Sequence, residues 1–263
     1  MKTLLLATTA LVFGIASASA ADLAARPYTK APVMAPTWNW SGFYFGGNVG
    51  YGIAHNETAQ GIFAGTPPTV LLGATTGPVA SDGVIGGVQI GWNTMFAPSW
   101  LFGIEADIQG ADVKGQQRFV SGLLFTPGDF AAVESRLNWF GTVRGRLGWT
   151  ATPETLIYVT GGLAYGEVET RNSSSFDIGG GVRENAAASL KSTKTGWTVG
   201  GGIESRLWNS NWTAKAEYLY VDLGSQTLVN STGPVTAFAH GSDVESRTHI
   251  IRAGLNYKFN SWN

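Results

Sequence analysis

The 263-residue chain has no cysteine, few charged residues and, beyond its first twenty residues, no apolar run long enough to cross a bilayer as a helix. Without cysteine it has no disulfide, no thiol nucleophile and no lipid-modified N-terminal cysteine. Charged residues make up 13% of the chain and the net charge is −1, so nothing in the composition suggests a nucleic-acid partner. What is abundant instead is glycine, with 36 residues, and tryptophan, with ten.

The first twenty residues have the features of a secretory signal peptide. A positive start at Lys2 precedes an apolar run over residues 4–15, and residues 18–20 form a small-x-small cleavage site. The apolar run is too short to span a bilayer, which disfavours the alternative of an N-terminal membrane anchor. We therefore expect residues 1–20 to be removed on export. Residues 21–41, which contain several prolines, predict an extended periplasmic linker.

The last segment, residues 248–259, alternates two chemistries with a period of two. One face carries apolar and aromatic side chains up to Phe259, and the other carries Arg252 and Lys258. Seven earlier segments show the same alternation: 43–53, 84–93, 100–109, 137–149, 157–165, 197–207 and 212–220. In each segment the apolar face is expected outward. In the segment 137–149, Leu137 is the first residue of that face.

This pattern predicts an all-β fold, an eight-stranded antiparallel up-and-down transmembrane β-barrel over residues 42–259, with a short C-terminal extension over 260–263. Four connections are long, roughly 54–82, 111–134, 169–192 and 222–244, and the other three are short turns. Bacterial barrels place long loops outside and short turns in the periplasm, so both chain ends are expected in the periplasm.

Aromatic residues agree with this orientation. Those beside short turns or chain ends predict a periplasmic girdle of Phe43, Trp92, Trp100, Trp149, Trp212, Tyr257 and Phe259. Those beside the long connections predict an outer girdle of Tyr51, Trp139, Tyr165, Trp197 and Tyr220. The alternative, a soluble lipocalin-like barrel, would bury apolar residues inside rather than Glu105, Arg144 and Lys215.

The predicted inward faces carry acids and bases that can pair. These residues are Glu105, Asp107, Arg144, Arg146, Glu204, Arg206, Lys215, Glu217, Arg252 and Lys258. Across the third short turn, Glu204 is expected opposite Lys215. Eight strands leave an interior that side chains just fill, so an ion-pair network is interpreted first as a polar plug and second as a narrow, gated path.

Three stretches resemble a known family: residues 38–52, 158–166 and 252–259 look like the small outer-membrane β-barrel proteins of alphaproteobacteria, often labelled porin-family proteins. The resemblance implies a surface-exposed envelope protein, with transport, adhesion and haem binding suggested for various members. Leu255, Tyr257 and Phe259 resemble the terminal signal read by the barrel-assembly machinery, although residues 260–263 follow the aromatic that usually ends such chains.

The resemblance also concerns the new N-terminus. In proteins of this kind, an Ala-Asp start is associated with covalent linkage to peptidoglycan, and here Ala21 would supply the free α-amine. The alternative is that residues 21–22 are only a good signal-peptidase exit.

The hypotheses of an enzyme activity and of a bound cofactor depend on three histidines. His249, with Ser246 and Glu245, has the groups of a lipid A deacylase, but strand parity and loop geometry separate them, so no catalytic residue is predicted. His55 and His240 could ligate a haem iron from two loops, which is kept as an alternative; no metal site or resident cofactor is predicted.

The expected function is that of a non-enzymatic outer-membrane barrel that supports envelope integrity and surface contacts. Its expected partners are outer-membrane lipid and lipopolysaccharide, the barrel-assembly machinery and peptidoglycan. The rival hypothesis is a narrow transporter of small solutes.

Overall fold

The structure, a computed structural model, describes residues 38–64, 70–119, 126–177, 181–231 and 238–259. The predicted signal peptide, Ala21, most of the predicted linker and the C-terminal extension lie outside these residues. Trp38 belongs to the same compact unit as the barrel strands. Among the described residues, no helix is long and apolar enough to cross a membrane.

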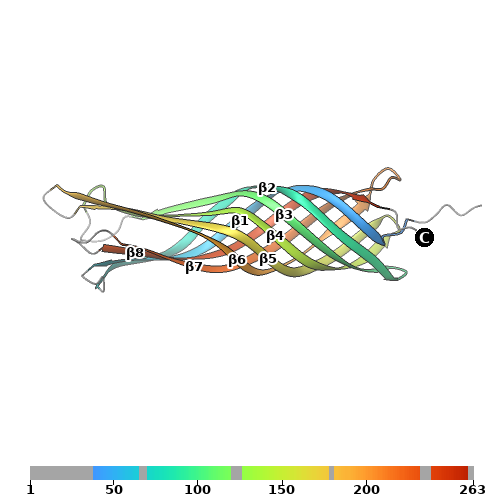
Figure 1. Cartoon of the computed structure of the whole chain (residues 1–263), viewed down its shortest axis with the longest axis horizontal. Coiled ribbons are helices and arrows are strands. Elements are labelled where there is room, and N and C mark those ends of the chain that lie inside the picture. Colours follow the sequence, from blue (N-terminus) through green and yellow to red (C-terminus); the bar gives the residue numbers. More distant parts are fainter. Residues whose placement is uncertain (1–37, 65–69, 120–125, 178–180, 232–237, 260–263) are drawn as a thin grey trace, which may run out of the picture. The chain divides into compact units, whose positions relative to one another are not determined.

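Eight antiparallel strands form one closed barrel, each paired with the next in the chain and the last with the first (Figure 1). The strands are β1 Gly42–Ala64, β2 Val70–Ala97, β3 Trp100–Phe119, β4 Phe130–Thr152, β5 Thr155–Asp177, β6 Arg183–Arg206, β7 Trp212–Ser231 and β8 Phe238–Lys258. The predicted fold class and strand order are confirmed. The barrel closes between β1 and β8, and just beyond β8 the Phe259 N–H donates to the Phe43 carbonyl at 2.9 Å.

The outer wall carries the apolar face that the alternation predicted. Valine, leucine, isoleucine and aromatic side chains are exposed along every strand in its periplasmic half, as in the series Phe43, Phe45 and Val49 on β1. Leu137 is an exception, because a bulge between Leu137 and Trp139 shifts the parity of β4 and buries this side chain in the lumen. The prediction that Leu137 faces lipid was therefore wrong.

The strands also continue well beyond their predicted ends. The connections at the far end shrink to residues 65–69, 120–129, 178–182 and 232–237, and most of the predicted long loops pair as strands. Their exposed side chains are mostly polar, as at Arg171 and Lys191, so the apolar alternation that identified the strands stops where the lipid is expected to stop. The apolar alternation therefore indicated where the strands are expected to leave the membrane, not where the strands end.

Beyond the membrane-level barrel, the described strands separate into two sheets. The β6–β7 ladder ends at Trp197 and Asp222, and the β2–β3 ladder ends at Asp82 and Lys114. The other six ladders continue, leaving one sheet of β7-β8-β1-β2 and one of β3-β4-β5-β6. A bulge in β7, with Gly224 at a φ of 76°, accompanies the β6–β7 separation.

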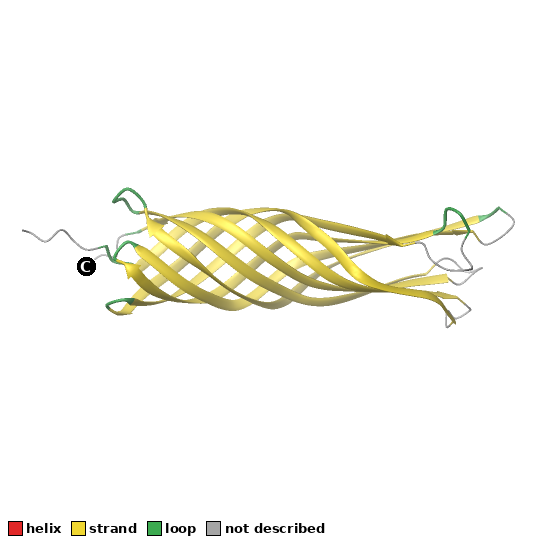
Figure 2. Cartoon of the chain, turned by 180° about the vertical axis from the view of Figure 1, so that it is seen from behind, coloured by secondary structure: helices red, strands yellow, loops and turns green. Residues whose placement is uncertain are grey.

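The two sheets pack against each other, and Figure 2 shows the strands drawing together at the end opposite the C-terminus. Val79, Val133 and Val244 meet between them. Asn172 on β5 adds polar contacts: its Nδ2 donates to the Leu228 carbonyl at 3.4 Å and its Oδ1 accepts from Ser242 at 3.0 Å.

Candidate functional site

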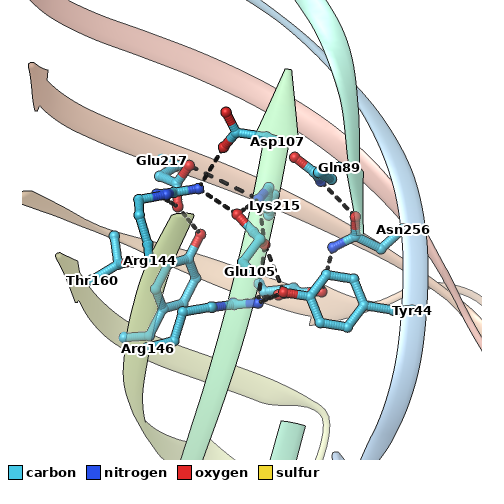
Figure 3. Close-up of polar contacts among 12 residues, drawn as sticks. Tyr44, Gln89, Glu105, Asp107, Arg144, Arg146, Thr160, Lys215, Glu217 and Asn256 are labelled. Atoms are coloured by element: carbon cyan, nitrogen blue, oxygen red, sulfur yellow. Dashed lines mark hydrogen bonds and ion pairs between the residues drawn. The ribbon is translucent and has the colours of Figure 1, made fainter. Parts of the chain in front are cut away.

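A layer of eight charged side chains crosses the lumen in the periplasmic half of the barrel (Figure 3). They project from inward positions of β3, β4, β6, β7 and β8, and all are buried. The layer consists of Glu105, Asp107, Glu204, Glu217, Arg144, Arg146, Lys215 and Arg252. Four carboxylates thus face four cations, so the formal charges of the layer cancel.

Glu105 lies at the centre of this layer. Its carboxylate contacts Arg144 and accepts from the Lys215 Nζ at 3.0 and 3.1 Å. Arg146 and Arg252 approach the same carboxylate at 3.4 and 3.6 Å. One acid is therefore within ion-pair distance of all four bases.

Asp107 and Glu217 complete the extracellular side of the layer. Arg144 reaches Asp107 at 3.0 Å and Glu217 at 3.1 Å. Arg252 reaches the same two carboxylates, Asp107 at 3.0 Å and Glu217 at 2.5 Å. Because the acids and bases come from strands on opposite sides of the barrel, these contacts tie its walls together across the lumen.

Glu204 and Arg146 form the periplasmic side, joined by an ion pair of 2.7 Å. Glu204 also accepts from Thr213 at 2.6 Å and from Asn256 at 2.8 Å. The ladder places Glu204 opposite Lys215, as the sequence predicted. Lys215 nevertheless extends to Glu105, because Thr213, Asn256 and Arg146 already surround the Glu204 carboxylate.

Neutral side chains that the sequence did not single out complete the network. The Tyr44 hydroxyl donates to Glu105 at 2.6 Å and accepts from Arg146 at 2.7 Å. The Tyr158 hydroxyl donates to Glu217 at 3.0 Å, and Gln89 donates to Asn256 at 2.6 Å. These residues share strand parity with the charged ones, so the inward pattern contained the signal.

Arg206 and Lys258 do not join the layer, contrary to the sequence prediction. Arg206 bonds the Ser210 carbonyl at 2.9 Å and approaches Glu154 at 3.4 Å, between two periplasmic turns. The Lys258 Nζ donates to the Ser41 carbonyl at 2.6 Å. Both lie at strand ends, too close to the mouth to reach the central carboxylates.

An apolar layer lies at the periplasmic mouth. Residues 38–41, predicted to be linker, enter the mouth here, and the Trp40 Nε1 donates to the Pro153 carbonyl at 3.1 Å. The layer is made of Trp40, Leu101, Leu156 and Tyr158, with Trp38 and Met95 packed against it. The Arg206 guanidinium lies 4.5 Å from the centroid of the Trp38 ring, which holds this segment in place.

A second apolar layer lies in the lumen on the extracellular side of the charges. Its members are Ile85, Val113, Leu137, Phe140, Ala164, Val168, Leu219, Val221, Leu223 and Ile250. One cavity beside it, next to Ser81 and Thr248, has a volume of about 10 Å³, which is on the order of one water. The lumen is thus only partly polar, and this apolar layer was not among the interior features predicted from the sequence.

The three histidines lie on two strands, His55 on β1 and His240 and His249 on β8. His240 pairs opposite Ile62, seven positions beyond His55 on β1, which separates the two backbones by about 23 Å. This backbone separation argues against a shared iron, and both residues lie in strands rather than in the predicted loops. His249 faces outward and bonds the Tyr218 hydroxyl at 2.7 Å, while Ser246 lines the lumen cavity.

The proposed assembly signal lies at the end of β8. Leu255 and Phe259 are exposed on the outer wall, and the Tyr257 and Phe259 rings contact edge to face at 5.4 Å. Its recognition by the assembly machinery stays a prediction.

Comparison with known proteins identifies what the chain is similar to. The model of the outer membrane protein beta-barrel domain matches residues 7–259. The 31 kDa outer-membrane immunogenic protein of Brucella melitensis is 38% identical over 264 residues, covering 98% of this chain and 100% of that protein. The 22 kDa outer membrane protein of Rhizobium leguminosarum is 29% identical, with 98% and 100% covered. The solved structure of OprG from Pseudomonas aeruginosa covers 86% of this chain and 100% of its own, with 16% identity and a TM-score of 0.47.

Proposed function

This chain belongs to the outer-membrane β-barrel domain family, and from that premise we propose that it is a non-conducting barrel that keeps the envelope sealed and presents its extracellular sheets for surface contacts. The protein resides in the outer membrane. Sealing means that the barrel occupies the membrane without opening an aqueous path through it.

The observation that supports this proposal is the succession of three layers of buried side chains along the lumen. The charged layer lies between the Trp40 layer at the periplasmic mouth and the Phe140 layer beyond it. A polar solute would have to cross two apolar layers, and a non-polar solute would have to cross a layer of paired charges. Neither class of solute therefore finds a favourable path.

The charged layer also resists opening. Separating a buried acid from its bases leaves uncompensated charge in a dry interior, which costs about 3–5 kcal/mol for one broken pair. Glu105 alone contacts four bases, so a passage through the centre would break several pairs together. This argues against the rival function as a narrow transporter.

Solute uptake into liposomes tests the proposal. We expect liposomes containing the refolded wild type to admit small sugars and amino acids no faster than protein-free liposomes. A double variant, Arg144→Ala with Phe140→Ala, removes bulk from two layers and should leak, whereas Arg171→Ala on the outer surface should not. Uptake by the wild type that rises with the amount of protein would favour the transporter.

A covalent anchor would strengthen the envelope role, and we extend the proposal to Ala21. Its α-amine would attack the thioester carbonyl of a peptide stem held on a transpeptidase cysteine, so that an amide bond forms and the thiol leaves. Mass spectrometry of lysozyme-digested sacculi should then find a peptide beginning at Ala21 that carries muropeptide mass. A peptide always free of that mass would show that the barrel is not anchored in this way.

A further inference from the structure

Hydroxyl groups gather in the interior between the Phe140 layer and the three valines that meet between the extracellular sheets. We call them the hydroxyl band, and its members are Ser81 on β2, Ser135 on β4, Thr170 on β5, and Ser246 and Thr248 on β8. The order can be followed on β4, where Leu137, Ser135 and Val133 succeed one another at inward positions. The polar groups therefore lie between two apolar clusters.

Two members of the hydroxyl band lack a partner within the chain. The Ser81 Oγ and the Thr170 Oγ1 form no hydrogen bond to any residue that the structure describes, although only 3% and 0% of the two residues is exposed. In folded proteins nearly all buried polar side chains are hydrogen-bonded, either to protein or to ordered water. The two hydroxyls therefore point to a small polar ligand.

A cavity of about 10 Å³ lies within the hydroxyl band. Four members of the band line it, and the fifth, Thr170, lies opposite Ser135 in the β4–β5 ladder. Val113 and Val168 of the Phe140 layer line it as well. A site can hold a water molecule when it offers about 10–15 Å³ and about 2–4 polar partners. The cavity matches a water in size and in chemistry, whereas a sugar or an acyl chain is far too large for it.

The residues around the cavity come from both extracellular sheets. Ser81 and Thr248 belong to the sheet of β7-β8-β1-β2, and Ser135 belongs to the sheet of β3-β4-β5-β6. The Ser81 side chain lies over Gly115 of β3, where a Cβ would collide with its Oγ. The β2–β3 ladder ends at the pair just before Ser81 and Gly115, so backbone bonds no longer join β2 to β3 at this level.

We propose that the cavity binds one ordered water molecule, which bridges the two extracellular sheets where the β2–β3 ladder stops. The water links Ser81 and Thr248 on one sheet to Ser135 on the other. A water molecule can donate two hydrogen bonds and accept two, and each hydroxyl can both donate and accept, so donors and acceptors can be matched. The water thus supplies a polar connection at a level where the ladder no longer makes one.

An ion fits the cavity less well. None of the described residues that line it carries a carboxylate, and the charged residue among them is Arg136, which disfavours a cation. A chloride ion is larger than a water molecule, and the Arg136 Nε already donates to Glu134 at 2.7 Å. Neutral water is therefore the favoured occupant.

A crystal structure of the refolded barrel can test the site, at a resolution that shows ordered water and with bromide in place of chloride. We expect density for one water within about 2.5–3.0 Å of hydroxyl oxygens from both sheets, without anomalous signal from bromide. Ser135→Val replaces a hydroxyl by methyl groups that fill the cavity, so it should lose this density. Thr198→Val is the matched control and should keep it, because the Thr198 hydroxyl is buried but bonds the Tyr220 carbonyl, away from the cavity lining.

The heat-dependent shift of the folded band on gels shows whether each variant folds. Thr248→Val is a second variant, on the other sheet, and should lower the occupancy of the water. Wild-type density that is missing or that contacts only one sheet would overturn the proposal, as would density that persists in Ser135→Val. A bromide peak would overturn it and assign the cavity to an anion. The Phe140 layer separates this site from the charged layer, so solute uptake into liposomes tests the sealed lumen independently of the bound water.

Discussion

The lumen and the extracellular sheets use the same kinds of side chain in opposite ways. In the lumen, Arg144 is fully buried and shares three carboxylates. On the outer face of the extracellular sheets, Arg171 pairs with Glu169 at 2.6 Å, but 46% of its side chain is exposed. Both are arginine–carboxylate contacts between strand residues. The difference teaches that burial, rather than the presence of an ion pair, decides what such a contact contributes.

The physical reason is the local dielectric. Water around Arg171 screens its attraction to Glu169, and Lys191 also pairs with this carboxylate at 3.6 Å, so we expect the exposed Arg171 to contribute about 0–1 kcal/mol. Arg144 has no water to replace a lost carboxylate, so its pairs are costly to break although forming them is no large net gain. Ion pairs in the lumen are therefore costly to disrupt, whereas charged residues on the outer face of the extracellular sheets can be replaced at little cost in stability.

The largest effect is expected from removing one base of the charged layer in the lumen. Arg144→Ala should lower the free energy of unfolding by about 3–5 kcal/mol, because it leaves buried carboxylates without one of their bases. Arg171→Ala should change it by no more than about 1 kcal/mol. Urea unfolding of the refolded barrels in lipid measures both, and equal losses would contradict the contrast between the two regions.

The outer wall offers a second contrast. Ala216 lies outward on β7, midway between Trp212 and Tyr220 of the two girdles, so Ala216→Arg should destabilise the barrel by about 2–4 kcal/mol. Ala187, exposed on β6 in the extracellular sheet, should accept arginine with a change of about 0.5 kcal/mol or less. The same unfolding experiment applies, and a silent Ala216→Arg would mean that this face does not meet lipid.

Contacts between the extracellular sheets should matter locally. Asn172→Ala removes the bonds to Leu228 and Ser242 and should cost about 1 kcal/mol. Amide hydrogen exchange should quicken beyond the ends of the interrupted ladders, while amides around the charged layer keep their protection. Faster exchange throughout the barrel would show that the sheets and the lumen unfold as one unit.

The smallest effect concerns the dependence of stability on pH at Asp129. Burial would raise the pKa of Asp129, but N–H groups of Thr126 and Asp177 and the Arg183 guanidinium hold it below its ordinary value. Its stabilising contribution should be complete above the ordinary aspartate pKa of about 4 and should disappear as the pH falls through the lowered value. The NMR shift of the Asp177 amide should report that titration, and a midpoint at or above 4 would contradict it.

Period-two alternation was enough to predict the barrel, the outward faces and the acids and bases that meet in the lumen. It failed at Leu137, because a bulge in β4 changes parity without any mark in the composition. It also ended the strands too early, since outward residues such as Arg171 and Lys191 are polar where the sheets leave the lipid.

The site was harder to predict than the fold. Parity placed Arg206 and Lys258 inward, but their height at the strand ends keeps them from the central carboxylates. Inward residues such as Phe140 and Leu219 do not show from sequence alone that they stack into a continuous apolar layer, because that depends on the stagger of strands around the barrel. Tyr44 had the correct parity and could have been included.

Single-channel recording in planar bilayers tests the sealed lumen most directly. The account predicts that refolded wild-type barrels, inserted in a known orientation, give no discrete conductance steps over the voltages that the bilayer tolerates. Repeated, uniform openings that scale with the number of inserted barrels would contradict it, since ions would then be crossing both apolar layers and the charged layer between them.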